Sequence, residues 1–192
     1  MTERPSRLLL SLLLLLRPPA PAPREDATAV FAGGCFWGVE SVFEHLRGVR
    51  SAVSGYTDRG IESVRLVYDP GQVSYRELLE VFFTVAHDPT LRDRQGPDIG
   101  PQYRAVVYYL SAEQRGQVDA YLGELARARR FARPIVTEVR PLGSFTVAEA
   151  LHQDYAARHP KEAYVVVNDA PKLARLRQLF PGLFRERQPV SE

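Results

Sequence analysis

The chain has 192 residues, of which 45% are hydrophobic and 25% charged, a composition typical of one globular domain with a sizeable core. Its net charge of +2 is small and its basic residues form no long run, so nucleic acid and anionic membranes are not indicated as partners. A single cysteine excludes an internal disulfide.

The first 23 residues have the pattern of a secretory signal peptide. Arg4 and Arg7 precede an apolar block at 8–16, which is shorter than the about 20 residues that span a bilayer. The segment Ala20-Pro21-Ala22 offers a cleavage site. We expect export to the periplasm or another extracytoplasmic space, whereas a leader that is not translocated would leave the protein in the cytoplasm.

The chain therefore divides into a signal-peptide-like leader at 1–23, a short linker at 24–27 and a domain at 28–192. No stable membrane span is expected after removal of the leader.

Hydrophobic periodicity predicts an alternation of strands and helices in the domain. Strands are expected at 28–32, 49–56, 61–68 and 103–110, and helices at 36–47 and 74–86. The order β-α-β-β-α-β is that of a ferredoxin-like split β-α-β unit. A helix from Ser111, a strand at 134–140, a helix at 147–158 and segments at 164–167 and 173–180 follow. We expect a two-layer α+β fold with additional C-terminal helices and strands.

The segment 33–40 contains the only cysteine and the only tryptophan of the chain. Cys35 lies between a predicted strand and a predicted helix, near the positive end of the helix dipole, a position that lowers the pKa of a thiol. Phe36 and Trp37 supply an apolar wall beside the sulfur. A nucleophilic thiol is indicated, although a lone cysteine is also commonly an inert buried residue.

Glu62 opens the apolar row of the predicted strand 61–68, because alternation places it on one face with Val64 and Leu66. Burial there would raise the pKa of the carboxyl and suit it to act as a general acid. The alternative is a glutamate at a strand end that lies in water. Glu40 is a poor substitute acid, because its place on the helix directs it away from the thiol.

The histidines do not indicate a metal site, because no pair has H-x-x-x-H spacing and no C-x-x-C motif is present. We interpret His152 as structural.

Seven motifs in order resemble the peptide methionine sulfoxide reductases of the A type. They are GCFWG at 34–38, GYT at 55–57, ESVRLVYDP at 62–70, HDPT at 87–90, RQGPD at 94–98, QYR at 102–104 and HQDY at 152–155. The resemblance implies reduction of methionine S-sulfoxide, free or in proteins, with repair of oxidised proteins and peptides as the role. It implies a monomer that uses neither a metal nor an organic cofactor.

The resemblance also assigns roles to single residues. Cys35 would attack the sulfoxide sulfur and become a sulfenic acid, while Glu62 supplies a proton. Phe36 and Trp37 would hold the S-methyl group. Asp98 lies on the long connection 87–101, and the resemblance implies that it orients neighbouring groups or holds water. Tyr103 lies just beyond this connection, at the base of the strand 103–110, and would donate a hydrogen bond to the substrate oxygen. Either could instead be structural, as a loop cap and a tyrosine at the edge of the core.

The sequence departs from the family in two places. No second cysteine is present, and the segment 164–172 resembles the single-cysteine branch, so an external small thiol or a thioredoxin-like protein would have to reduce Cys35. Only residues 58–61 separate Thr57 from Glu62, where family members carry a longer loop with a further tyrosine. The alternative is therefore an impaired relative that acts as a thiol redox sensor or a peptide-binding module.

Overall fold

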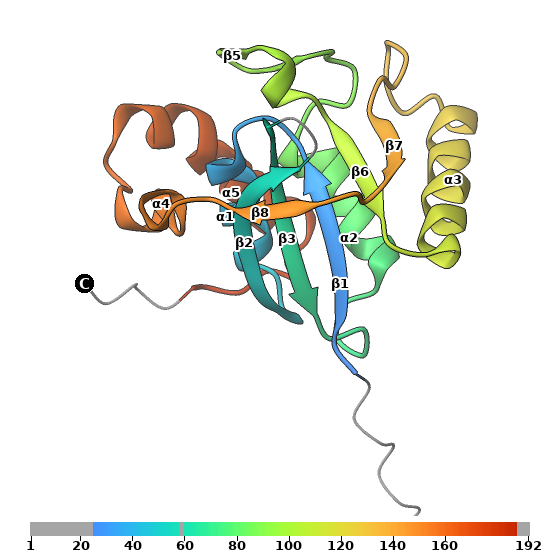
Figure 1. The fold of residues 1–192 in the computed structure, drawn as a ribbon, viewed down its shortest axis with the longest axis horizontal. Helices are drawn as coiled ribbons and strands as arrows, with labels where there is room; N and C mark the ends of the chain where they lie inside the picture. The colour runs from blue at the N-terminus through green and yellow to red at the C-terminus, as the bar shows by residue number, and fades with distance from the viewer. Residues whose placement is uncertain (1–24, 58–59, 188–192) are drawn as a thin grey trace, which may run out of the picture.

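The computed structural model describes residues 25–57 and 60–187, which build a sheet with helices α1 and α2 on one face (Figure 1). The central elements are β1 (Ala27–Ala32), α1 (Phe36–Glu44), β2 (Val49–Thr57), β3 (Ile61–Tyr68), α2 (Tyr75–Val81) and β6 (Val106–Tyr109). These four strands lie in the order β6-β1-β3-β2, and every neighbouring pair among them is antiparallel. The predicted ferredoxin-like split β-α-β unit and the α+β class are thus confirmed.

Two further strands extend this unit to a six-stranded sheet. Strand β7 (Glu138–Pro141) runs parallel to β6 at one edge, and β8 (Phe145–Val147) runs antiparallel to β2 at the other. A separate hairpin consists of β4 (Arg94–Gln95) and β5 (Asp98–Ile99). The remaining elements are the π-helix η2 (Phe82–Ala86), the 3₁₀ helices η3 (Pro101–Tyr103) and η4 (Ala150–His152), α3 (Ala112–Arg127), α4 (Tyr155–Arg158), the π-helix η5 (Val165–Asp169) and α5 (Ala170–Leu179).

The hydrophobic core fixes α1 against the sheet. Val39, Val42 and Phe43 on α1 are fully buried, as the helical spacing predicted. The ring of Phe31 on β1 stacks on Phe43 and on Phe82, with ring centroids 5.4 and 4.8 Å apart. Strand β1 and helix α1 therefore hold the loop between them at a defined place in the fold.

The start of α2 has the predicted capping box. The Glu77 amide donates to the Ser74 hydroxyl oxygen at 3.2 Å, and the Ser74 amide donates to the Glu77 carboxylate at 2.7 Å. These bonds satisfy backbone donors that the first turn of a helix leaves free. The predicted helix 74–86 continues beyond α2 as the π-helix η2.

The continuous helix predicted at 147–158 is wrong, because only the short 3₁₀ helix η4 and the single turn α4 are helical there. Val147 instead ends strand β8, where it pairs with Gly55. The Gln153 side chain accepts from the Ser54 amide and donates to the Ser54 carbonyl, so the chain near Gln153 is bound to β2. Asp154 has φ of +56°, which interrupts a right-handed helix. Side-chain bonds to a neighbouring strand thus outweigh the local helical pattern.

The strand predicted at 103–110 begins three residues later than expected. Gly100 has φ of +148°, and Pro101 opens the 3₁₀ helix η3, which contains Tyr103. Strand β6 starts only at Val106, so Tyr103 lies in a helical turn before the strand. The helix predicted at 36–47 ends at Glu44, and the strand predicted at 134–140 starts at Glu138.

Within residues 25–57 and 60–187, no helix has both the length and the apolar character needed to cross a bilayer. The predicted leader and residues Asp58 and Arg59 lie outside the described residues.

Candidate active site

Cys35 occupies the position immediately before the first residue of α1, as the sequence predicted. Its side chain is 8% exposed. Gly34 before it has φ of +88°, and a Cβ at this position would lie 2.4 Å from the Cβ of Gln95. Glycine is therefore required both for the backbone conformation and for the close approach of the β4 hairpin to the thiol.

The predicted acidity of the thiol is wrong. Burial is the main cause that raises the pKa of Cys35, to about 12, and the negative charge of Glu62 raises it further. A hydrogen bond from Tyr164 and one from the Trp37 amide act in the opposite direction. The position at the start of α1 does not compensate for the loss of water, because burial disfavours the charged form of a thiol. The resting site thus holds Cys35 as a protonated thiol.

Glu62 lies beside the thiol and is bound to the same helix start. Its Oε2 accepts a hydrogen bond from the Phe36 amide, the first backbone donor of α1, at 3.0 Å. Burial raises the pKa of the Glu62 carboxyl to about 7, and the charge of Asp98 adds to the increase. A carboxyl that holds a proton near neutral pH is suited to general acid catalysis.

Aromatic rings enclose one side of the site. The indole of Trp37 stacks on the Tyr155 ring with centroids 3.6 Å apart, and its Nε1 donates to His152 Nδ1 at 3.3 Å. The Phe36 ring lies against Tyr56 and His152, at centroid distances of 5.5 and 5.3 Å. Phe36 and Trp37 are therefore held in fixed orientations, and the structure places His152 where it orients Trp37.

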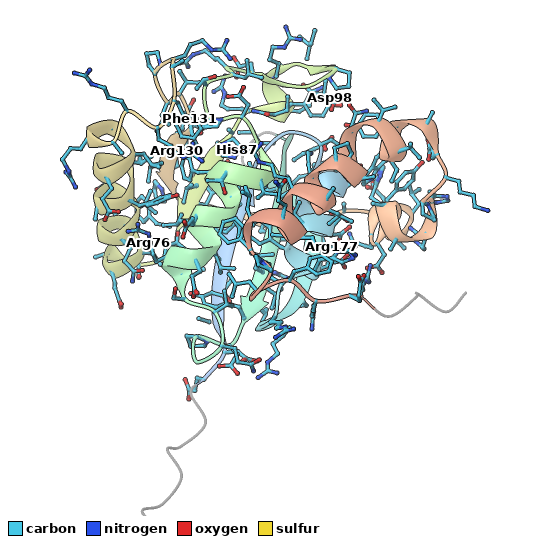
Figure 2. The ribbon with its side chains drawn as sticks, turned by 180° about the vertical axis from the view of Figure 1, so that it is seen from behind. Arg76, His87, Asp98, Arg130, Phe131 and Arg177 are labelled. Atoms are coloured by element: carbon cyan, nitrogen blue, oxygen red, sulfur yellow. The ribbon has the colours of Figure 1, made fainter. Side chains whose placement is uncertain are left out.

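Tyr164 is the site residue that the sequence reasoning missed. Its hydroxyl donates to Asp98 Oδ2 at 2.5 Å, and its side chain is hydrogen-bonded to the Cys35 thiol. Burial, followed by the bond to Asp98, raises the pKa of this phenol far above its usual value. Asp98 thus contacts Tyr164, and Figure 2 shows it where the β4–β5 hairpin meets the C-terminal helical region. The available signal was the resemblance of 164–172 to the single-cysteine branch.

Tyr103 belongs to the same group of side chains. Burial raises the pKa of its phenol, and the charges of Glu62, Asp98 and Cys35 act on it in the same direction. Its hydroxyl thus remains protonated at neutral pH and can act as a donor. The four predicted catalytic side chains are therefore brought together, although they come from the residue before α1 and from β3, β5 and η3.

Asp169 lies behind the first turn of α1. Its carboxylate is 2% exposed, and neither oxygen has a hydrogen-bond partner among the described residues. Lys172 Nζ lies 3.6 Å from Oδ1. A Cβ on Gly38 would lie only 2.2 Å from the same oxygen, so this glycine makes room for the carboxylate.

Glu40 is excluded as a replacement acid by its contacts. It is 1% exposed and accepts from the amides of Ser54 and Asp154, at 3.2 and 2.9 Å. It therefore binds β2 and the segment before α4, as expected of a side chain that points away from the thiol.

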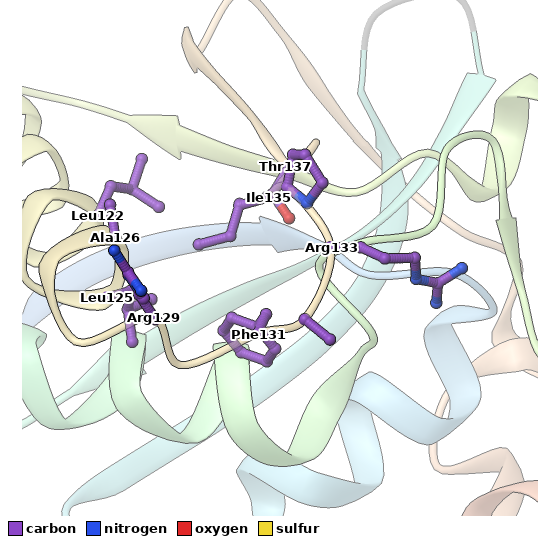
Figure 3. A pocket seen from close by; sticks show the side chains of 10 residues that line it. Leu122, Leu125, Ala126, Arg129, Phe131, Arg133, Ile135 and Thr137 are labelled. Carbon is purple, nitrogen blue, oxygen red and sulfur yellow. The ribbon is translucent and has the colours of Figure 1, made fainter.

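A separate cavity of about 730 Å³ lies between α3 and the chain that leads to β7 (Figure 3). Leu122, Phe131 and Ile135 are among its apolar lining residues. Thr137 at its border is hydrogen-bonded through Oγ1 to His87 Nε2 at 2.9 Å. Since its lining residues include none of the side chains grouped around Cys35, this cavity is distinct from the candidate active site.

A buried thiol before the first turn of α1, and a half-buried carboxyl on β3 that accepts from the first amide of that helix, define a thiol-dependent redox site within an α+β domain. The sequence model of the family "Peptide methionine sulfoxide reductase" matches residues 27–61 and 57–182. The two matched segments overlap at residues 57–61, from the end of β2 to the start of β3. The chain belongs to this family.

Similar proteins support the same assignment. The chain is 44% identical to "Peptide methionine sulfoxide reductase MsrA 2" of Mesorhizobium japonicum, over 83% of this chain and 90% of that protein. It is 42% identical to "Peptide methionine sulfoxide reductase MsrA" of Thermus thermophilus, over 85% of this chain and 99% of that protein.

Solved structures resemble the chain as well. Methionine sulfoxide reductase A of Corynebacterium diphtheriae matches with a TM-score of 0.61 and 32% identity, over 73% of this chain and 78% of that chain. The reduced form of Mxr1 from Saccharomyces cerevisiae matches with a TM-score of 0.60 and 29% identity, over 74% of this chain and 90% of that chain.

Proposed function

We propose that the protein is a thiol-dependent peptide-methionine (S)-S-oxide reductase that acts on protein-bound and free methionine sulfoxide. The observation that carries this proposal is the pairing of the Cys35 thiol with Glu62 at the first turn of α1. A sulfoxide sulfur becomes electrophilic when its oxygen is protonated or strongly hydrogen-bonded. The site supplies both a nucleophile and a proton donor for this purpose.

The chemistry proceeds in two half-reactions. The Cys35 sulfur attacks the sulfoxide sulfur, and the oxygen receives a proton from Glu62 and is transferred to Cys35. Methionine leaves after gaining two electrons, while Cys35 loses two and becomes a sulfenic acid. A first external thiol then forms a mixed disulfide with Cys35 and releases water, and a second thiol restores Cys35.

The two pKa values determine where the protons are. At pH values between about 7 and 12, Glu62 and Cys35 together hold one proton, and most of it is on the sulfur. Catalysis requires that this proton be on Glu62 and that the sulfur be charged. Protonation of Glu62 removes a negative charge that opposes the thiolate, so transfer of the proton within the pair activates both groups at once.

The tyrosines and aromatic residues complete the mechanism. Tyr103 donates to the substrate oxygen. The single hydroxyl proton of Tyr164, which Asp98 accepts in the resting site, is donated to the sulfur of Cys35 as the thiolate forms. Asp98 orients Tyr164 through its hydrogen bond. Phe36 and Trp37 receive the S-methyl group and so select the S epimer.

The regeneration step requires a partner, because Cys35 is the only cysteine of the chain. The reductant is a small thiol or a thioredoxin-like protein. The leader predicted at 1–23 supports repair of oxidised proteins outside the cytoplasm.

The experiment follows loss of N-acetyl-methionine S-sulfoxide and, separately, its R epimer, with dithiothreitol as the reductant. Wild type should turn over only the S epimer, and Cys35→Ser should be inactive. Glu62→Gln should be slower by about 10²- to 10⁴-fold, the usual contribution of a general acid.

A second measurement separates the two roles of Glu62. Glu62→Gln should speed alkylation of Cys35 by iodoacetamide, because it removes a negative charge that raises the thiol pKa. Turnover unaffected by Glu62→Gln would refute its role as the acid. A folded wild-type protein without turnover would favour the redox sensor or peptide-binding relative.

A further inference from the structure

Exposed apolar side chains are concentrated in the chain segments that also carry Asp98, His152 and Tyr164. Among the described residues, seven large hydrophobic side chains are exposed, and five of them lie in the segments 98–99, 147–152 and 164–169. These five are Ile99, Val147, Leu151, Val166 and Val167, and we call them the apolar rim.

Two residues of the apolar rim are sequence neighbours of residues that support the candidate active site. Ile99 follows Asp98, which binds Tyr164. Leu151 precedes His152, whose ring accepts the hydrogen bond of Trp37. In Figure 1 the β4–β5 hairpin and the C-terminal helical region stand on two sides of the loop between β1 and α1.

The exposures are large for apolar side chains. Ile99 is 69% exposed, Leu151 59% and Val166 49%. Isolated exposed hydrophobic residues are ordinary on protein surfaces, whereas a group around a site marks a surface that contacts a partner.

The depth of the thiol identifies the partner. Cys35 is 8% exposed, so a methionine sulfoxide must insert its short side chain to reach the sulfur. The backbone of a polypeptide substrate then lies at the mouth of the site, and the residues next to the sulfoxide contact the surrounding surface. Methionine in folded proteins is usually buried among other apolar residues, and its oxidation disrupts such cores.

We propose that the apolar rim binds the residues on both sides of the methionine sulfoxide in an extended, unfolded polypeptide, and so selects sulfoxides with apolar neighbours. This inference rests on the proposed function and narrows its substrate class. The rim increases the affinity for segments from protein cores, which become accessible only when a protein unfolds.

The test compares two acetylated pentapeptides with a central methionine S-sulfoxide and dithiothreitol as the reductant. One peptide carries leucine and valine neighbours and the other carries serine and glycine. Wild type should prefer the apolar peptide about tenfold in kcat/KM, which corresponds to about 1.4 kcal/mol. The combined variant Ile99→Ser, Leu151→Ser and Val166→Ser should lose this preference and retain wild-type turnover of N-acetyl-methionine S-sulfoxide.

The chain offers a matched control. Leu110 and Leu179 are 43% and 45% exposed and lie next to α3 and at the end of α5, outside the three segments of the rim. The double variant Leu110→Ser and Leu179→Ser should keep the full preference. An equal loss in this variant, or an unchanged preference in the rim variant, would overturn the proposal.

Two readouts separate other outcomes. If the rim variant loses rate only when a thioredoxin replaces dithiothreitol, the surface binds the reductant and the proposal is wrong. Titration of the peptides against the fluorescence of Trp37, the only tryptophan, measures binding without turnover. Weaker binding of the apolar peptide to the rim variant would support the inference even in a protein that lacks reductase activity, whereas equal binding would refute it.

Discussion

Replacement of Tyr164 by phenylalanine tests whether the C-terminal region completes the active site. The variant keeps the ring, which meets the Trp37 indole edge-on at a centroid distance of 5.7 Å. It removes only the hydroxyl, which donates to Asp98 Oδ2 and is hydrogen-bonded to Cys35. Any effect therefore reports the hydroxyl and not the packing of the ring.

The size of the effect follows from the charge on its partner. A hydrogen bond to a charged group contributes about 1.5–3 kcal/mol, and about 1.4 kcal/mol corresponds to a factor of ten. If Tyr164 stabilises the thiolate as it forms, kcat/KM should fall about 10- to 100-fold. Alkylation of Cys35 should also slow, because the bond from Tyr164 lowers the pKa of the thiol.

The assay is turnover of N-acetyl-methionine S-sulfoxide with dithiothreitol, together with urea unfolding to establish that the variant is folded. Tyr155→Phe is the matched control, because its ring also contacts Trp37 while its hydroxyl bonds Glu162 instead of Cys35. Activity of Tyr164→Phe within twofold of wild type, or an equal loss in Tyr155→Phe, would show that the hydroxyl of Tyr164 has no part in the reaction.

Three further predictions concern protons and packing. The kcat/KM should rise tenfold per pH unit up to about pH 7 and then stay level. The rate of Cys35 alkylation, which needs only the thiolate, should keep rising through pH 9. Parallel pH profiles of the two rates would contradict a single proton shared by Cys35 and Glu62. Burial raises the pKa of Glu44 to about 9, so between pH 5 and pH 9 the folded protein keeps a proton on Glu44 that the unfolded chain has lost. The free energy of unfolding should therefore fall as the pH rises from 5 to 9. Urea titrations at each pH should show a smaller fall in Glu44→Gln. Gly38→Ala should lower the free energy of unfolding in urea by about 1–3 kcal/mol, because its Cβ would overlap the buried Asp169 carboxylate. The control Gly116→Ala lies on α3 with open space around it and should leave this free energy unchanged or raise it.

The sequence predicts the central fold because its signals are local. The alternation at 61–68 matches β3 residue for residue, and the spacing of Val39, Val42 and Phe43 predicts the buried face of α1. Local patterns place Cys35 at the start of a helix and Glu62 at the start of a strand, but only the resemblance to the family relates the two residues to one another. The order of the four central strands then follows from the split β-α-β arrangement.

The errors arise where contacts distant in sequence decide the conformation. The pattern at 147–158 is helical when considered alone, yet the bonds of Gln153 to Ser54 hold the chain against β2. Tyr164 could not be assigned to the site from its own neighbours, because its partners Asp98 and Cys35 lie on other elements. No local periodicity reports such contacts.

The raised pKa of Cys35 changes how the site should be understood. A thiol at a helix start, considered alone, would be a thiolate at neutral pH and open to oxidation by any small oxidant. In this fold, burial and the charge of Glu62 keep the sulfur protonated. In the proposed mechanism, the sulfur becomes nucleophilic when the shared proton moves to Glu62, from which the sulfoxide oxygen can accept it. The same carboxyl would then both disfavour the resting thiolate and, once protonated, favour it, so the proposed mechanism depends on the position of one proton.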